Sequence, residues 1–158
     1  MQAQSKIEFD LAEYVPLINE VIESGGEFRL FPRGTSMLPL LRQGKDSVVL
    51  VKKQQQLRKR DIIFYRRPNG QFVLHRIVKK VKDGTYVLCG DNQTLPEKGI
   101  DDSMIIASVS AVYRNEKRIE KSAFRRRFYE LFWCVMPLRK IVLFVRRALS
   151  KVKRIFIK

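Results

Sequence analysis

Two residue types in this sequence could together perform nucleophilic catalysis on a carbonyl group. Ser36 stands in the segment GTSMLP (34–39), directly after a β-type run, with a glycine two residues before it and a proline three residues after it. Glycine lets the backbone turn sharply, so a serine there can project from the turn with its own N–H on the same side. Such a serine suits a nucleophile that also contributes to an oxyanion hole, although a serine in a turn is more often structural.

The base that a serine nucleophile needs could be the single histidine of the chain. His75 lies in the middle of the β-type segment VLHRI (73–77). An unperturbed imidazole, with a pKa of about 6.5, is mostly neutral at pH 7 and can accept a serine proton. Asp91, in the segment GDN (90–92), could orient that imidazole, or it could satisfy backbone N–H groups in an Asx turn. A lone strand histidine is more often structural, but the order Ser, His, Asp favours a hydrolase.

Five short segments in this order resemble the type I signal peptidases and the related self-cleaving serine proteases of SOS repressors. They are GTSMLP (34–39), GKDSVV (44–49), RDIIFY (60–65), LHRI (74–77) and GDN (90–92), within residues 27–113. The resemblance implies that Ser36 is the nucleophile. It also implies that His75 is the general base, because the endoplasmic-reticulum, archaeal and sporulation-associated branch has histidine where the housekeeping enzymes and the repressors have lysine.

Two carboxylates remain open as the support of His75. Asp91 matches the aspartate of the GDN segment, and Glu97 falls near the acidic residue that the Ser–His branch has shortly after that segment. We rank Asp91 first, as an orienting or structural carboxylate, and Glu97 second. The housekeeping branch has an oxyanion-binding hydroxyl two residues before the nucleophile; here that residue is Gly34, so the hole would rest on the Ser36 N–H. The resemblance implies no metal and no cofactor.

The elements that must position these residues have the pattern of one helix followed by a β domain. Apolar residues recur at helical spacing from Leu11 to Ile22, Asp10 could cap that helix, and two glycines end it at 25–26. From residue 28 short runs rich in β-branched and aromatic residues alternate with turn motifs at 68–70 and 83–84. The fold class predicted is mainly β (α+β), a signal-peptidase-like twisted antiparallel domain. Its strands are expected at 28–31, 47–51, 62–65, 72–81, 86–89 and 104–113.

Charge is distributed unevenly along the 158 residues. The chain has a formal net charge of +16, and residues 114–158 alone have 15 Lys and Arg against 3 Asp and Glu, a net of +12. After residue 118 apolar residues return at helical spacing, with basic residues filling much of the remaining surface. We therefore predict an N-terminal helix (1–26), a serine protease domain (27–113) and a basic amphipathic helical tail (114–158).

Three roles compete for that tail. A basic amphipathic helix with aromatic residues such as Tyr129 and Trp133 suits an anionic membrane surface, and we expect residues 124–158 to bind one. The apolar stripe could instead dock on the β domain. Nucleic acid is the least favoured partner, because the stripe is too broad and too aromatic for an arm that only tracks phosphates.

Several weaker sequence patterns bear on where in the cell the protein is located. Two cysteines with one histidine form neither a disulfide framework nor a zinc pattern, which favours a reduced compartment. The first residues have no apolar signal-peptide core. The longest stretch without a charged residue, 103–113, has 11 residues, whereas a spanning helix needs about 20. We therefore expect a membrane-associated protein, peripheral on the cytoplasmic side.

The function predicted from these patterns is a serine endopeptidase that cleaves a signal or leader peptide from a precursor. Its partner would be that precursor peptide or protein, bound in an extended form at a strand edge beside Ser36. The alternative is a non-catalytic protein of the same fold that tethers a partner to the membrane surface.

Overall fold

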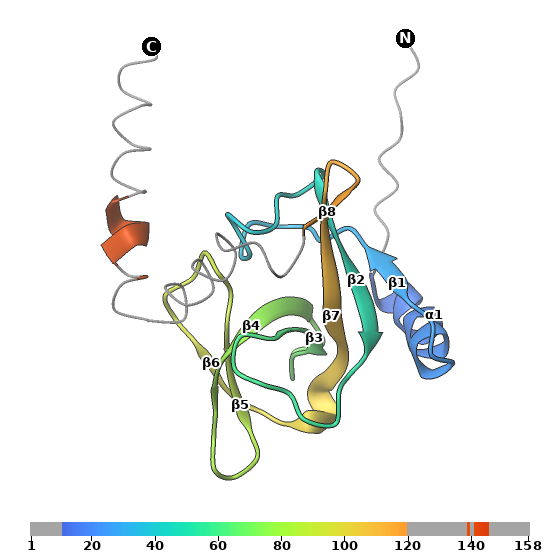
Figure 1. The fold of residues 1–158 in the computed structure, drawn as a ribbon. Coiled ribbons are helices and arrows are strands. Elements are labelled where there is room, and N and C mark those ends of the chain that lie inside the picture. Colours follow the sequence, from blue (N-terminus) through green and yellow to red (C-terminus); the bar gives the residue numbers. More distant parts are fainter. Residues whose placement is uncertain (1–10, 120–138, 140, 146–158) are drawn as a thin grey trace.

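The computed structural model describes residues 11–119, Arg139 and residues 141–145. In these residues a helix, α1 (Leu11–Glu23), precedes an eight-stranded sheet, with one short 3₁₀ helix, η1 (Asp102–Met104), before the long strand β7 (Figure 1). The strands are β1 (Phe28–Leu30), β2 (Asp46–Lys52), β3 (Ile62–Arg66), β4 (Phe72–Lys80), β5 (Tyr86–Cys89), β6 (Glu97–Ile100), β7 (Ile105–Arg114) and β8 (Lys117–Ile119).

The sheet is antiparallel throughout. Its order is β1-β2-β7-β3-β4-β5-β6, and β8 pairs with β7 off this path. Register shifts interrupt four of the ladders, β2–β7, β3–β7, β4–β5 and β5–β6, and such bulges bend and twist strands. Figure 1 shows the arrangement of the elements, with α1 beside β1 and β2 at one side of the sheet and the β5–β6 hairpin at the other. The mainly β, α+β fold class is thereby confirmed.

Strand β3 separates two apolar clusters, because alternate residues of a strand face opposite sides. Ile62 and Phe64 belong to the cluster beneath α1, whereas Ile63 and Tyr65 belong to the cluster beside β5 and β6. His75 lies directly opposite Ile63 in the β3–β4 ladder and therefore shares its face. The first cluster also contains Ile18, Ile22, Met37, Leu41, Val48, Leu50 and Val112, and the second Leu57, Ile77, Leu88, Ile100 and Ile105.

The expected helix and all six expected strands are present, with bounds that differ by a few residues. The helix ends where glycine was expected to end it: Gly25 has a φ of +84°, and its N–H donates to the Ile22 carbonyl. Pro16 lies inside α1 without ending it. The proposed cap, Asp10, lies outside the described residues.

Two strands were not expected. Glu97–Ile100 (EKGI) and Lys117–Ile119 (KRI) have few β-branched residues, and each forms only because a neighbouring strand pairs with it. Strand β8 carries the sheet to residue 119, beyond the boundary predicted at 113. Of the predicted tail helices, Arg139 and residues 141–145 are helical, and the remainder lies outside the described residues.

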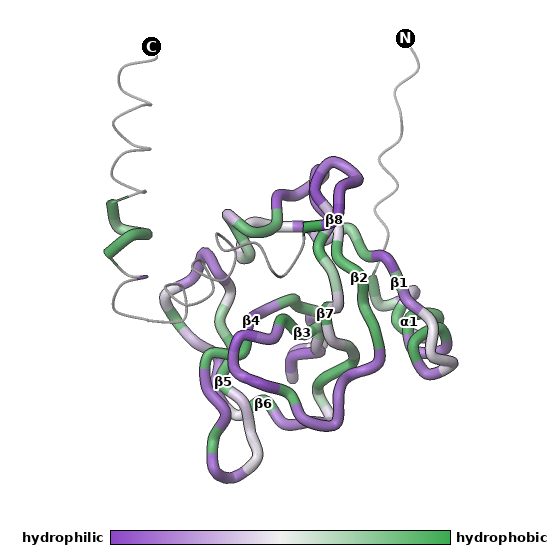
Figure 2. Tube along the Cα trace, viewed as in Figure 1, coloured by the Kyte–Doolittle hydropathy of each residue, from purple (hydrophilic) through white to green (hydrophobic). Residues whose placement is uncertain are grey.

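Figure 2 shows where hydrophobic residues lie along the fold. The apolar stretches of α1, β2 and β7 lie together, the β7–β8 turn and the β2–β3 connection are mostly hydrophilic, and residues 141–145 form an apolar helical turn. Four of these five side chains are exposed: Ile141, Val142, Phe144 and Val145. Among the described residues no helix is both long and apolar enough to cross a membrane.

Candidate active site

Ser36 lies in a tight turn between β1 and β2. Gly34 has a φ of +86°, a left-handed conformation that only glycine adopts without strain, and its N–H donates to Gln43 Oε1 at 2.9 Å. Met37 and Leu41, directly after Ser36, are buried in the core beneath α1 and fix the turn. Ser36 itself is half-buried. The turn therefore presents Ser36 from a rigid base.

His75 is buried at the centre of β4, with a polar partner on one ring nitrogen. Its Nδ1 lies 3.1 Å from the Tyr65 hydroxyl oxygen and 3.1 Å from Glu97 Oε1. An ionised carboxylate can only accept hydrogen bonds, so the network assigns the proton of the neutral ring to Nδ1. Nε2 then has the free electron pair that a general base needs, and within the described part of the chain it has no hydrogen-bond partner.

Ser36 and His75 meet beside Gly90. A Cβ atom built on Gly90 would lie 2.7 Å from the Ser36 carbonyl oxygen and 2.9 Å from His75 Nε2, so both groups pack against this glycine. The Asn92 N–H donates to the Ser36 carbonyl at 2.6 Å, which ties the serine turn to the loop after β5. The Ser36 hydroxyl does not reach Nε2 here, and in proteins without substrate this hydrogen bond is often long.

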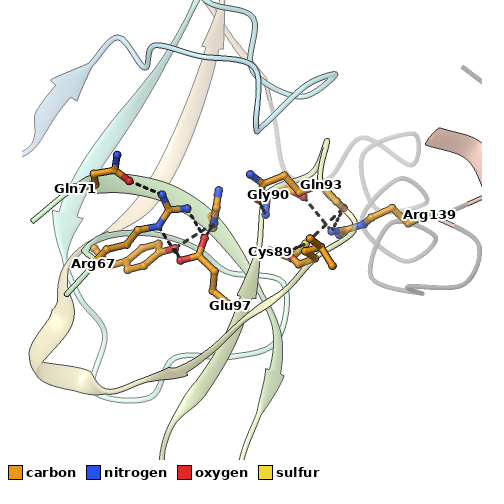
Figure 3. Close-up of polar contacts among 10 residues, drawn as sticks. Arg67, Gln71, Cys89, Gly90, Gln93, Glu97 and Arg139 are labelled. Carbon is orange, nitrogen blue, oxygen red and sulfur yellow. Dashed lines mark hydrogen bonds and ion pairs between the residues drawn. The ribbon is translucent and has the colours of Figure 1, made fainter. Parts of the chain in front are cut away.

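The carboxylate at the imidazole belongs to Glu97. Glu97 accepts a hydrogen bond from the Tyr65 hydroxyl at 2.8 Å and is held by Arg67, whose Nε donates to Oε2 at 2.8 Å and whose Nη2 contacts Oε1. Figure 3 shows Arg67 between Glu97 and Gln71, whose side-chain oxygen accepts from Arg67 Nη1 at 2.8 Å. Strand β6 returns antiparallel to β5, with Glu97 opposite Leu88, and this register brings the carboxylate back to His75.

Asp91, ranked first from the sequence as an orienting or structural carboxylate, has a different partner. Its two carboxylate oxygens accept hydrogen bonds from Arg76 Nε at 2.9 Å and Nη2 at 2.8 Å, and both side chains are buried. A third nitrogen of the same guanidinium, Nη1, donates to the Arg60 carbonyl at 2.9 Å. Asp91 therefore neutralises a buried guanidinium beneath the loop, while Glu97 is the carboxylate in contact with the imidazole.

The comparisons with known proteins bear on this geometry. The model of the Peptidase S24-like family matches residues 1–110, which contain Ser36, His75, Asp91 and Glu97. The chain belongs to the Peptidase S24-like family. Membership supports a serine-peptidase type of chemistry, and the family also includes self-cleaving repressors. Searches of curated proteins and of solved structures returned no significant match.

The electrostatics of this S24-like site keep the imidazole neutral and the carboxylate charged. Burial lowers the pKa of His75 to about 4, although the nearby Glu97 charge acts in the opposite direction. Burial alone would raise the pKa of Glu97, but hydrogen bonds from Arg67 and Tyr65 outweigh it and lower that pKa below its usual range. Burial and the Glu97 carboxylate raise the pKa of Tyr65, so its hydroxyl stays protonated and donates. At neutral pH the site holds an uncharged base beside an ionised carboxylate.

An open groove of about 930 Å³ runs past Ser36 and His75. Its walls come mainly from β1 and the segment after it, from α1, and from the first half of β4. Most of the lining is apolar and includes Tyr14, Phe28, Leu30, Phe31, Met37, Phe72 and Leu74. Strand β1 stands at one end of the sheet order, and among the described strands it pairs with β2 alone.

Sequence patterns did not identify two members of this site. Tyr65 reads as an ordinary core residue of a strand, and Arg67 as a solvated charge before a turn. The alternation of β3 places Tyr65 on the face of His75, but this became usable only once the β3–β4 register was known. Among the described residues there is no group of three or more His, Cys, Asp or Glu that could hold a metal ion.

Proposed function

We propose that this protein is a serine endopeptidase that cleaves a signal or leader peptide from a precursor, with Ser36 as nucleophile and His75 as general base. One observation carries the proposal: a neutral buried imidazole has Nδ1 on an ionised carboxylate and its free Nε2 beside the serine turn. This is the arrangement in which a serine, a base and an orienting carboxylate act as a unit. Family membership supports the peptidase class, and the signal-peptidase branch is part of the proposal.

The chemistry can be followed atom by atom. The Ser36 hydroxyl oxygen attacks the scissile carbonyl carbon while its proton passes to His75 Nε2. In this mechanism Glu97 stabilises the imidazolium that forms, and the Ser36 N–H donates to the oxyanion. The C–N bond then breaks, and Nε2 gives the proton to the leaving amine. A water molecule, deprotonated by the same nitrogen, hydrolyses the acyl-enzyme and restores Ser36.

The groove suggests how a substrate binds. An extended peptide can add to the free edge of β1 through main-chain hydrogen bonds, while alternate side chains enter the groove. The lining favours apolar side chains, as the hydrophobic part of a signal or leader peptide would provide.

The tail supports a second proposal, a peripheral membrane location. Four exposed apolar side chains lie in residues 141–145, within a segment that has a net charge of +12. An apolar surface flanked in the sequence by basic residues fits an anionic membrane, where the protein would meet membrane-inserted precursors on the cytoplasmic side. The same observation would suit a non-catalytic tether, so the decisive test must concern cleavage.

That test compares protein N-termini by mass spectrometry in cells that express wild type or Ser36→Ala at equal levels. Ser24→Ala, an exposed serine at the end of α1, is the matched control. A peptidase leaves a set of precursors uncut only in the Ser36→Ala cells, and those precursors reveal the cleavage rule. Identical N-termini in all three would reject the peptidase and leave the tether.

A further inference from the structure

Arg139, far from the sheet in sequence, is buried against the loop that joins the two halves of the active site. Its Nη1 donates to the Gly90 carbonyl at 3.1 Å and to the Gln93 carbonyl at 3.5 Å. Figure 3 shows the side chain extending from the C-terminal helical turn to this loop, next to Cys89. Arg139 is 0 % exposed, and its hydrogen bonds to these two carbonyls offset part of the free-energy cost of burying a charged group.

Leu143, in the same segment, is buried as well. It is 1 % exposed, whereas its neighbours Val142 and Phe144 are exposed. Residues at i and i+4 share one face of a helix, so Arg139 and Leu143 lie on the buried face of this segment. Arg139 links that face to the β domain through its hydrogen bonds to the carbonyls of residues 90 and 93.

The loop held by Arg139 sets the geometry of both proposed catalytic residues. Within residues 90–93, the Asn92 N–H holds the Ser36 carbonyl, and Gly90 lies against His75 Nε2. The Gln93 side-chain oxygen accepts from the Gly90 N–H at 3.3 Å, and the Gln93 backbone N–H donates to the Gly90 carbonyl at 3.0 Å. Arg139 spans the loop by binding the carbonyls of its first and last residues.

We propose that Arg139 is a positioning residue, and that the C-terminal segment completes the active site by fixing the 90–93 loop between Ser36 and His75. The proposal rests on the proposed function for its effect on cleavage, but not for its effect on the imidazole. A guanidinium presents several N–H groups in a rigid plane, whereas a lysine ammonium is a compact group on a flexible chain. Arg139→Lys should therefore preserve the charge but hold the loop less firmly.

The single histidine makes the test direct. In full-length protein labelled with ¹⁵N-histidine, only His75 contributes imidazole signals. Arg139→Gln should move the Nε2 resonance and raise the pKa of His75 towards its ordinary value, because a loosened loop admits water to a nitrogen that is now buried. The charged groups that act on the ring, Glu97, Arg67 and Asp91, are unchanged by this substitution. Arg139→Lys should give a smaller shift in the same direction.

Cleavage supplies the second readout, on a precursor identified by the Ser36→Ala comparison. Misplacing the Ser36–His75 pair should lower kcat by about 100-fold, with KM changed much less, because the groove does not include Arg139. Lys117→Gln, an exposed cation in β8, is the control for loss of one positive charge and should change neither readout.

The outcomes separate the two proposals. Unchanged His75 resonances and pKa in Arg139→Gln would overturn the positioning role, whether or not the protein cleaves anything. Shifted resonances in a protein without Ser36-dependent cleavage would support the positioning role and reject the peptidase. If Arg139→Gln does not show the circular dichroism spectrum of a folded protein, the same histidine resonances are measured in Arg139→Lys instead. Resonances of Arg139→Lys that equal those of wild type would overturn the proposal.

Discussion

At the scale of single residues, the site separates two carboxylates that follow the same strand. Glu97 contacts the imidazole and is fixed by Arg67 and Tyr65, whereas Asp91 is paired with the buried Arg76. Removing the charge of Glu97 should therefore impair the orientation of the imidazole, whereas removing the charge of Asp91 should leave a buried cation without its counter-ion.

Glu97→Gln should lower kcat/KM by about 1,000-fold, because an amide can donate to Nδ1 and hold the ring in the wrong tautomer. Folding stability should change far less, since Glu97 is partly exposed. Steady-state kinetics on a cleaved precursor, with urea unfolding in parallel, measure both. A variant with wild-type kcat/KM would remove Glu97 from the catalytic unit.

Asp91→Asn is the matched substitution, and we expect it to reduce stability more than it reduces kcat/KM. Removing the charge that faces Arg76 should lower the free energy of unfolding by about 3 kcal/mol, because a buried guanidinium loses its ionised partner. Urea unfolding measures this loss. A stability equal to that of wild type, with kcat/KM strongly reduced, would return Asp91 to the catalytic role that its sequence position indicated.

His75 should also give the protein a distinct dependence on pH. Because its pKa is about 4 when folded and about 6.5 when unfolded, the unfolded chain binds the extra proton between these values. The contribution of His75 to the free energy of unfolding is therefore fully present above pH 6.5. It is lost as the pH falls to 4, which lowers the free energy of unfolding by about 3 kcal/mol. Urea unfolding at pH 7, 5.5 and 4.5 measures the free energy of unfolding of wild type and of His75→Gln. The contribution of His75 is the part of the decrease with falling pH that wild type shows and His75→Gln does not. For the same reason kcat/KM should stay high well below pH 6.5.

At the scale of elements, the decisive piece is the short loop between β5 and β6. It contacts the serine turn, the imidazole and the C-terminal segment, although it belongs to no strand or helix. Its first residue must be glycine for a steric reason: a Cβ there would lie within 3 Å of the Ser36 carbonyl oxygen and of His75 Nε2.

Gly90→Ala should therefore move the loop away from the site. We expect a loss of about 1–3 kcal/mol in stability, as for overpacked positions, and a fall of about 100-fold in kcat from misplacement of the catalytic pair. Urea unfolding and kinetics measure the two effects. A fully active Gly90→Ala variant would contradict the close packing on which the site is built.

The same scale explains what the sequence could predict. The sequence could single out Ser36 and His75 as candidates because their local segments have recognisable residues at fixed spacing. The roles of Asp91 and Glu97 were not, because both follow β5 and only the return of β6 decides which one reaches the ring. Tyr65 and Arg67 join the site through the β3–β4 register, and Arg139 through docking of a distant segment, neither of which local patterns encode.

At the scale of the whole molecule, charge and exposed apolar surface are concentrated in the C-terminal segment. Ile141, Phe144 and Val145 are exposed in a region with a net charge of +12, beyond a domain that is nearly balanced. Each basic residue near an anionic lipid contributes about 1 kcal/mol, so the proposed attachment of the tail to a membrane would depend strongly on its charge.

Full-length protein should therefore sediment with vesicles that contain phosphatidylserine, and much less with neutral phosphatidylcholine vesicles. Phe144→Asp should reduce this binding by removing exposed apolar surface, and added salt should weaken it through screening. Phe31→Asp is the control, because Phe31 is also exposed (57 %, against 74 % for Phe144) but lies on the groove. Equal sedimentation with both kinds of vesicle, or of both variants, would count against membrane attachment through the tail.

Strand β7 joins the part of the chain that contains Ser36 to the part that contains His75. One edge of β7 pairs with β2, which follows the Ser36 turn, and the other edge pairs with β3, which is joined to the strand of His75. The chain crosses from β2 to β3 through the exposed residues 54–56. Two fragments divided there would each contain one member of the Ser36–His75 pair, and β7 would be the template on which they reassemble. Fused to two interacting proteins, such fragments would turn peptide cleavage into a reporter of that interaction.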